Sequence, residues 1–84
     1  MIPPPHTDDI YEEIEYRQFL TGTVRRGVVG WHEGPKQWVT LQVRDGPMAS
    51  AQATTLASAY RFARLKLLLF GYVPSLGGAS APFT

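Results

Sequence analysis

Residues 49–70 read ASAQATTLASAYRFARLKLLLF, and the spacing of their apolar side chains sets the expected fold. Seven of them recur at intervals of four and three: Ala49, Ala53, Leu56, Tyr60, Ala63, Leu67 and Phe70. An α-helix makes one turn about every 3.6 residues, so this spacing places all seven side chains on one face of a helix. The stretch therefore predicts one long helix whose apolar face packs against the rest of the domain.

The flanking residues indicate where this helix begins and ends. Pro47 suits a first helical position, because the N–H that proline lacks has no partner there. Gly71 is a typical residue for ending a helix in the left-handed conformation, and Pro74 prevents the helix from resuming. These signals predict a helix over about residues 48–70.

The last two turns of the predicted helix carry more apolar side chains than one face can hold. Four of them point away from the main stripe, so this end is apolar nearly all the way round. A chain of 84 residues has little else with which to cover them. We therefore expect a second chain to bury this surface. The predicted partner-binding residues are these four together with a following tyrosine: Phe62, Leu65, Leu68, Leu69 and Tyr72.

Residues 20–44 have the composition of β-structure. Val39, Leu41 and Val43 alternate with residues of the other face, which is the pattern of a strand with one buried side. A turn-forming segment at residues 32–36 separates this strand from an earlier β-rich stretch, so the sequence predicts a β-hairpin over about residues 20–44. The expected fold class is α+β: a small antiparallel sheet of two or three strands, covered by one long C-terminal helix.

Residues 9–18 fit two local structures. Asp9 and Glu12 have the spacing of a capping box and Ile10 lies four residues before Ile14, which together favour a short N-terminal helix. Alternation of apolar and amphipathic residues from Ile14 to Leu20 fits a strand instead. We favour the helix and leave the strand open.

The ends of the chain differ in composition from its middle. Three consecutive prolines within residues 1–8 predict a flexible arm, and residues 75–84 are mostly small, so we expect them to form a flexible tail. Residues 9–74 are expected to form a single α+β domain. No apolar run is long enough to span a bilayer, and the first residues lack the pattern of a secretory signal. We therefore expect a cytoplasmic protein without a membrane partner.

Few side chains are suited to catalysis. The chain has no cysteine, and its two histidines, His6 and His32, lie far apart and outside any metal-binding motif. We therefore expect no enzyme, no metal site and no cofactor. One short motif, Tyr11-Glu12-Glu13-Ile14, resembles the phosphotyrosine ligands of Src-type SH2 domains. The resemblance implies that such a domain would bind the motif if Tyr11 is phosphorylated and the segment is exposed and extended.

Charge is unevenly distributed along the chain, although the net charge is only +1. Five of the seven acidic residues precede residue 16, whereas all eight lysines and arginines follow it. The simpler interpretation is that an acidic N-terminal segment neutralises a basic body. The alternative is a hairpin whose cations contact phosphates and whose tryptophans stack on bases. The residues predicted for that nucleic-acid contact are Arg25, Arg26, Trp31, Lys36, Trp38 and Arg44.

The surplus of apolar helix surface favours binding to protein over binding to nucleic acid. We expect a small non-catalytic module of the adaptor or inhibitor type, a format often encoded by phages and other viruses, that forms a homodimer or binds a protein target through the helix. The two hypotheses differ in their response to salt. An apolar interface hardly weakens between low and moderate salt, whereas a phosphate-led interface weakens steeply.

Overall fold

The computed structural model describes residues 10–75, which form five strands and one helix. Their bounds are β1 Ile10–Gln18, β2 Val24–His32, β3 Gln37–Val43, β4 Met48–Ala53, α1 Leu56–Leu68 and β5 Tyr72–Ser75. The predicted arm, residues 1–8, and all but the first residue of the predicted tail, residues 75–84, lie outside the described residues.

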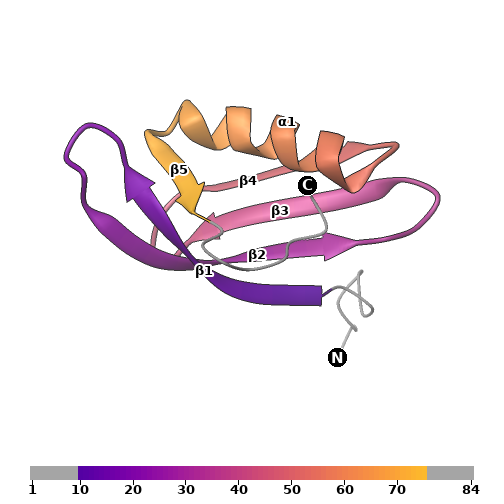
Figure 1. Cartoon of the computed structure of the whole chain (residues 1–84), viewed down its shortest axis with the longest axis horizontal. Coiled ribbons are helices and arrows are strands. Elements are labelled where there is room, and N and C mark those ends of the chain that lie inside the picture. The colour runs from indigo at the N-terminus through magenta and orange to yellow at the C-terminus, as the bar shows by residue number, and fades with distance from the viewer. Residues whose placement is uncertain (1–9, 76–84) are drawn as a thin grey trace.

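The five strands form one antiparallel sheet in the order β4-β3-β2-β1-β5. The first four strands follow one another as a meander, and α1 then carries the chain from one edge strand, β4, to the opposite edge strand, β5 (Figure 1). The sheet curls beneath α1, which covers one of its faces. We call the covered face the inner face and the opposite one the outer face.

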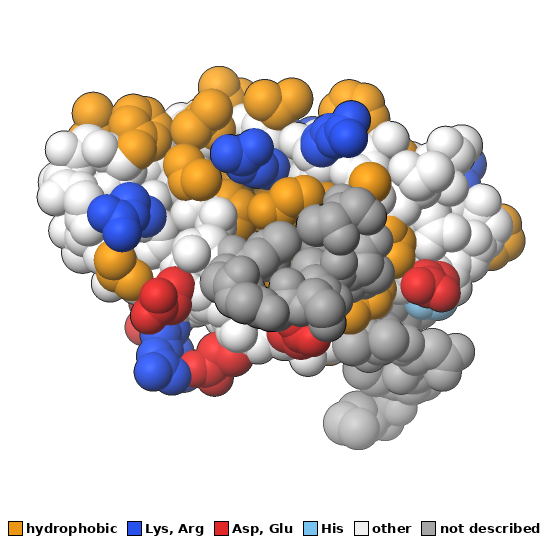
Figure 2. Space-filling model, viewed as in Figure 1, with side chains coloured by type: hydrophobic (Ala, Val, Ile, Leu, Met, Phe, Trp, Pro, Cys, Tyr) orange, Lys and Arg blue, Asp and Glu red, His pale blue; other side chains and the backbone are white. Residues whose placement is uncertain are grey.

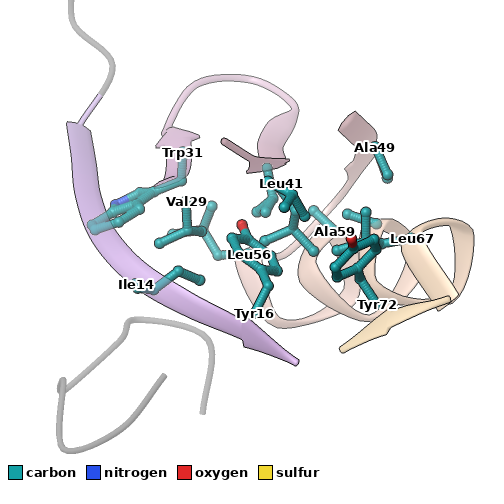
Figure 3. Packing of buried hydrophobic residues seen from close by; sticks show 14 residues of the cluster. Ile14, Tyr16, Val29, Trp31, Leu41, Ala49, Leu56, Ala59, Leu67 and Tyr72 are labelled. Carbon is teal, nitrogen blue, oxygen red and sulfur yellow. The ribbon is translucent and has the colours of Figure 1, made fainter. Parts of the chain in front are cut away.

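The core lies between the inner face and one stripe of α1. Val29, Val39 and Leu41 come from neighbouring strands, lie in register and are completely buried. Ala59 and Ala63, one turn apart on α1, are also completely buried, because their small side chains let the helix approach the sheet closely. Figure 3 shows these residues packed in one cluster that extends from Trp31 at one end to Tyr72 at the other.

The predicted fold class is wrong, because the sheet and not the helix dominates the structure. Five strands replace the expected two or three, and α1 has 13 residues where about residues 48–70 were expected to be helical. Residues 48–53 form β4 instead. Ala49 and Ala53 fit a helical spacing, but Ala51 lies between them, and all three lie on the inner face as alternate residues of a strand. Pairing with β3 therefore outweighs the helical preference of alanine.

The preference for a short N-terminal helix over residues 9–18 is also wrong, and the strand that remained open is correct. β1 pairs with β2 along one side and with β5 along the other, which supplies backbone partners that a local sequence pattern cannot reveal. Ile14 and Tyr16 alternate onto the inner face and are buried. The Tyr11-Glu12-Glu13-Ile14 motif is extended but is already part of the sheet, with Tyr11 opposite Gly30.

The start of helix α1 is capped by Thr55, which the sequence analysis did not identify. The Thr55 hydroxyl accepts a hydrogen bond from the Ser58 N–H at 3.1 Å, which satisfies one of the free donors at the helix start. The helix ends at Leu68, two residues before the expected end, and Gly71 has the expected left-handed conformation, with a φ of 90°. Pro74, expected to follow the helix, lies within β5.

The side chain of Tyr16 extends from β1 across β2, and its hydroxyl lies between β2 and β3. Its hydroxyl donates to the Val28 carbonyl at 2.5 Å and accepts from the Gln42 N–H at 3.1 Å. Val28 and Gln42 lie opposite each other, so the hydroxyl bridges two backbone groups of facing residues. Gly27 makes room for the ring, because a Cβ at this position would lie 2.6 Å from Tyr16 Cε2. Burial raises the pKa of Tyr16, since the charged phenolate would be poorly solvated there.

Candidate protein-binding site

Large apolar side chains gather at the surface around the C-terminal end of α1. Figure 2 shows them along the side of the molecule formed by the helix. Their exposed fractions range from 41% for Leu68 to 87% for Leu69. We call this group the apolar shoulder, and it consists of Phe19, Leu20, Phe62, Leu65, Leu68, Leu69 and Phe70.

Two segments distant in sequence meet in the apolar shoulder. Most of its residues lie on α1 or just beyond it, whereas Phe19 and Leu20 belong to the turn between β1 and β2. A backbone hydrogen bond of 3.0 Å from the Phe19 N–H to the Gly71 carbonyl joins the turn to the end of the helix. This bond continues the β1–β5 register and holds the turn in place beside the helix.

Helix α1 carries a second apolar stripe on its exposed side. Phe62, Leu65 and Leu69 follow one another at spacings of three and four, so they line up along the helix, away from the buried positions Ala63 and Leu67. This is the spacing with which helices pack against one another. We call these three residues the outer stripe.

The structure brings together four of the five residues predicted for partner binding. Tyr72 is separate from them: it lies in β5, is buried on the inner face, and its hydroxyl accepts a hydrogen bond of 3.1 Å from Arg25 Nη1. Sequence reasoning missed Phe19 and Leu20, although two adjacent large apolar residues before a turn at Gly22 are a usable signal. It also assigned Phe70 to the buried stripe, whereas its exposed fraction is 61%.

The members of the apolar shoulder together expose a large apolar area. A large aromatic side chain offers about 150–250 Å², and we take about 150–200 Å² as an average for the leucines and phenylalanines of the shoulder. At the exposed fractions of its seven members, the shoulder presents roughly 650–850 Å² of apolar surface. The largest patch on an ordinary monomer is about 300–600 Å², and each partner in a standard interface buries about 800 Å².

The residues predicted for nucleic-acid contact are spread over both faces of the sheet. Arg25 lies on the inner face with Tyr72, whereas Arg26 lies on the outer face and forms a 2.6 Å ion pair with Glu13. Trp31 is buried in the core. The remaining three are exposed or half-buried elsewhere in the hairpin: Lys36, Trp38 and Arg44.

A hollow of about 300 Å³ opens on the outer face beside the ion pair. Its charged lining residues are two bases and two acids, Arg26 and Arg44 with Glu13 and Asp45. Their formal charges cancel, which gives this hollow no net attraction for a polyanion. This hollow therefore does not form a basic surface, and nucleic-acid binding stays a prediction.

Residues 10–75 offer little else that is typical of a chemical site. Within this range no group of three or more His, Asp or Glu side chains is placed to hold a metal ion. The same residues contain no helix long and apolar enough to cross a membrane. No protein-family model matches the chain, and neither the curated proteins nor the solved structures include a match.

Proposed function

We propose that this protein is a small non-catalytic binding module that associates with a second copy of itself through the apolar shoulder. The observation that carries the proposal is the amount of apolar surface exposed around the end of α1. Leaving it in water is unfavourable by about 25 cal/mol for each Å², so its burial provides a driving force for association.

A second copy is the occupant that the shoulder fits best. Its estimated area is close to the contribution of one partner to a standard interface. A two-fold interface needs a surface that is complementary to itself, and a row of apolar side chains at helical spacing meets this condition. Adaptor and inhibitor roles suit such a module, because a dimer presents two copies of every other surface to a target.

The decisive experiment measures molar mass in solution as a function of protein concentration. We expect the wild type to form dimers that persist from low to moderate salt. The double variant Leu65→Asp/Leu69→Asp should be monomeric, because two charges would have to be buried in the interface. Both positions are exposed in the protomer, so the variant should keep its fold and its circular dichroism spectrum.

The matched control is Gln42→Asp, which places a carboxylate on the exposed outer face, away from the shoulder. It should dimerise like the wild type. A wild-type protein that stays monomeric up to millimolar concentration would overturn the proposal, and so would a double variant that dimerises as well as the wild type.

A further inference from the structure

We infer that the second copy docks on the outward edge of β4, along which no other strand of residues 10–75 pairs, so that two β4 strands pair antiparallel about a two-fold axis and the sheets of both protomers become continuous. The inference rests on the proposed self-association and specifies its surface. It makes the β4 edge part of the interface, together with the flank of α1 that lies above it.

The register of the sheet shows which backbone groups this edge presents. The Val43 N–H donates to the Pro47 carbonyl at 3.0 Å, and the same register continues through Leu41 opposite Ala49. In an antiparallel pair, hydrogen-bonded and non-bonded residues alternate. The backbone groups that point away from β3 are therefore those of Met48, Ser50 and Gln52. A contact of 2.9 Å from Lys66 Nζ to the Ser50 carbonyl agrees with this direction.

The composition of β4 suits pairing with its own copy. Its sequence, MASAQA, contains no proline and no charged residue, the features with which edge strands usually prevent such pairing. Its central position is Ser50, and antiparallel pairing about that residue places Met48 opposite the partner's Gln52. The outward N–H and carbonyl groups of each strand then meet those of the other.

The position of α1 allows the two helices to meet at the same time. Neighbouring strands lie about 4.8 Å apart, so a two-fold axis between the β4 strands would lie about 2.4 Å from β4 and about 7 Å from β3. Helix α1 packs mainly on these two strands, which places it about 5 Å from the axis. The two helices would then lie about 10 Å apart, close to the 8–10 Å of packed helices.

The flank of α1 above this edge carries part of the outer stripe of the shoulder. Lys66 marks the flank, because its ammonium group reaches the Ser50 carbonyl of β4. Phe62 precedes Lys66 by four residues and Leu69 follows it by three, so both lie on the same side of the helix. Edge pairing of β4 would therefore bring these flanks of the two helices together and cover the exposed strand along with Phe62 and Leu69.

Lys66 makes this docking dependent on ionic strength. In the dimer the Ser50 carbonyl would accept from the partner's Ser50, so the ammonium group must give up its place. Two Lys66 side chains would then lie near the two-fold axis and repel each other, and salt screens such repulsion. Dimerisation should accordingly become several-fold tighter from low to moderate salt.

The test compares Ser50→Pro with Ser50→Ala. Proline removes the N–H that faces the outward edge without removing a bond to β3, whereas alanine keeps the N–H and removes the same hydroxyl. We expect Ser50→Pro to be monomeric, by sedimentation, at concentrations where Ser50→Ala and the wild type are dimers. If Ser50→Pro dimerises normally while Leu65→Asp/Leu69→Asp does not, edge pairing is overturned and association through the shoulder remains.

Amide hydrogen exchange tests the same inference without any substitution. The Ser50 and Gln52 amides should exchange rapidly in dilute protein and at least ten-fold more slowly at concentrations where the protein is dimeric. The Ala51 amide faces β3 in both states and serves as the internal control. Rapid exchange at Ser50 and Gln52 in a proven dimer would overturn edge pairing, even if the proline variant does not fold.

Discussion

The two edges of the sheet are built differently. β5 has four residues, and the bond from the Phe19 N–H to the Gly71 carbonyl sets a register in which the backbone groups of Tyr72 and Pro74 point away from β1, although both side chains are buried. Proline has no N–H to offer, so half of that short edge cannot donate to another strand. β4 has six residues without proline or charge, and Lys66 contacts one of its outward carbonyls.

The two flanks of the helix lie above different edges of the sheet. The flank of α1 above β4 carries the apolar residues Phe62 and Leu69 beside Lys66. Arg64 lies four residues from Tyr60 and four from Leu68, so it belongs to the other flank, toward β5. Each flank thus carries one cation among apolar side chains: Lys66 toward β4 and Arg64, with Leu68, toward β5. The difference between the two edges therefore lies in their strands, and the composition of β4 favours it as the edge for the proposed second copy.

The largest effect is expected from breaking the sheet that joins the two edges. In Gly27→Ala the added Cβ would overlap the Gln42 carbonyl oxygen and lie 2.6 Å from the ring of Tyr16. Backbone cannot move aside as a flexible side chain can, so we expect a loss of about 3 kcal/mol or more in the free energy of unfolding. Urea denaturation followed by circular dichroism measures it.

Gly46→Ala is the control for that experiment. Its added Cβ would approach the side chain of Val43 at 3.2 Å, at an exposed turn, and we expect a much smaller loss. Equal stabilities for Gly27→Ala and the wild type would show that β2 and β3 do not pack around Tyr16 as described, and that the two edges need not belong to one rigid sheet.

A smaller loss is expected from Tyr16→Phe, which keeps the ring and removes the bridging hydroxyl. The Val28 carbonyl and the Gln42 N–H would then lack a partner, at a cost of about 1–3 kcal/mol. Burial raises the pKa of Tyr16 in the folded state above its value in the unfolded chain. The stabilisation from the neutral Tyr16 hydroxyl is therefore complete below about pH 10, where the tyrosine of the unfolded chain is still neutral. It is lost as the pH rises further, because the unfolded tyrosine then ionises first.

Tyr16→Phe should consequently lose less stability between neutral and alkaline pH than the wild type does. Tyr60, whose pKa burial also raises, leaves the variant with some alkaline sensitivity. Identical dependence of the unfolding free energy on pH in the two proteins would contradict the position of the hydroxyl inside the sheet.

Local patterns in the sequence predicted the parts of the fold that depend on neighbouring residues. They located the inward-facing residues Val39, Leu41 and Val43, the left-handed glycine after the helix, and the excess of apolar side chains around Leu65 and Leu69. These features follow from periodicity and backbone conformation alone. The same patterns do not reveal which strands lie side by side.

The remainder of the fold depends on contacts between distant segments. Alternate alanines in residues 49–53 fit a strand as well as a helix, and pairing with β3 decides between the two. Residues 10–18 have a helical start signal, but partners on both sides make them a strand. The place of Phe19 in the shoulder depends on its bond to Gly71, and the need for glycine at position 27 depends on the ring of Tyr16. None of these contacts has a local sequence signature.

The smallest expected effect is on the strength of dimerisation, and it comes from removing one cation from either flank of α1. Lys66→Met keeps the length of the side chain but removes the charge that would meet its copy near the two-fold axis, so the dimer should become about three- to ten-fold tighter at low salt, or about 0.7–1.4 kcal/mol. Arg64→Met makes the matched change on the flank toward β5 and should alter the dissociation constant less than two-fold. Sedimentation equilibrium at low and high salt measures both, and the difference between the variants should shrink as salt rises. If Arg64→Met tightens the dimer more than Lys66→Met, the second copy docks on the β5 side and the comparison of the two edges is reversed.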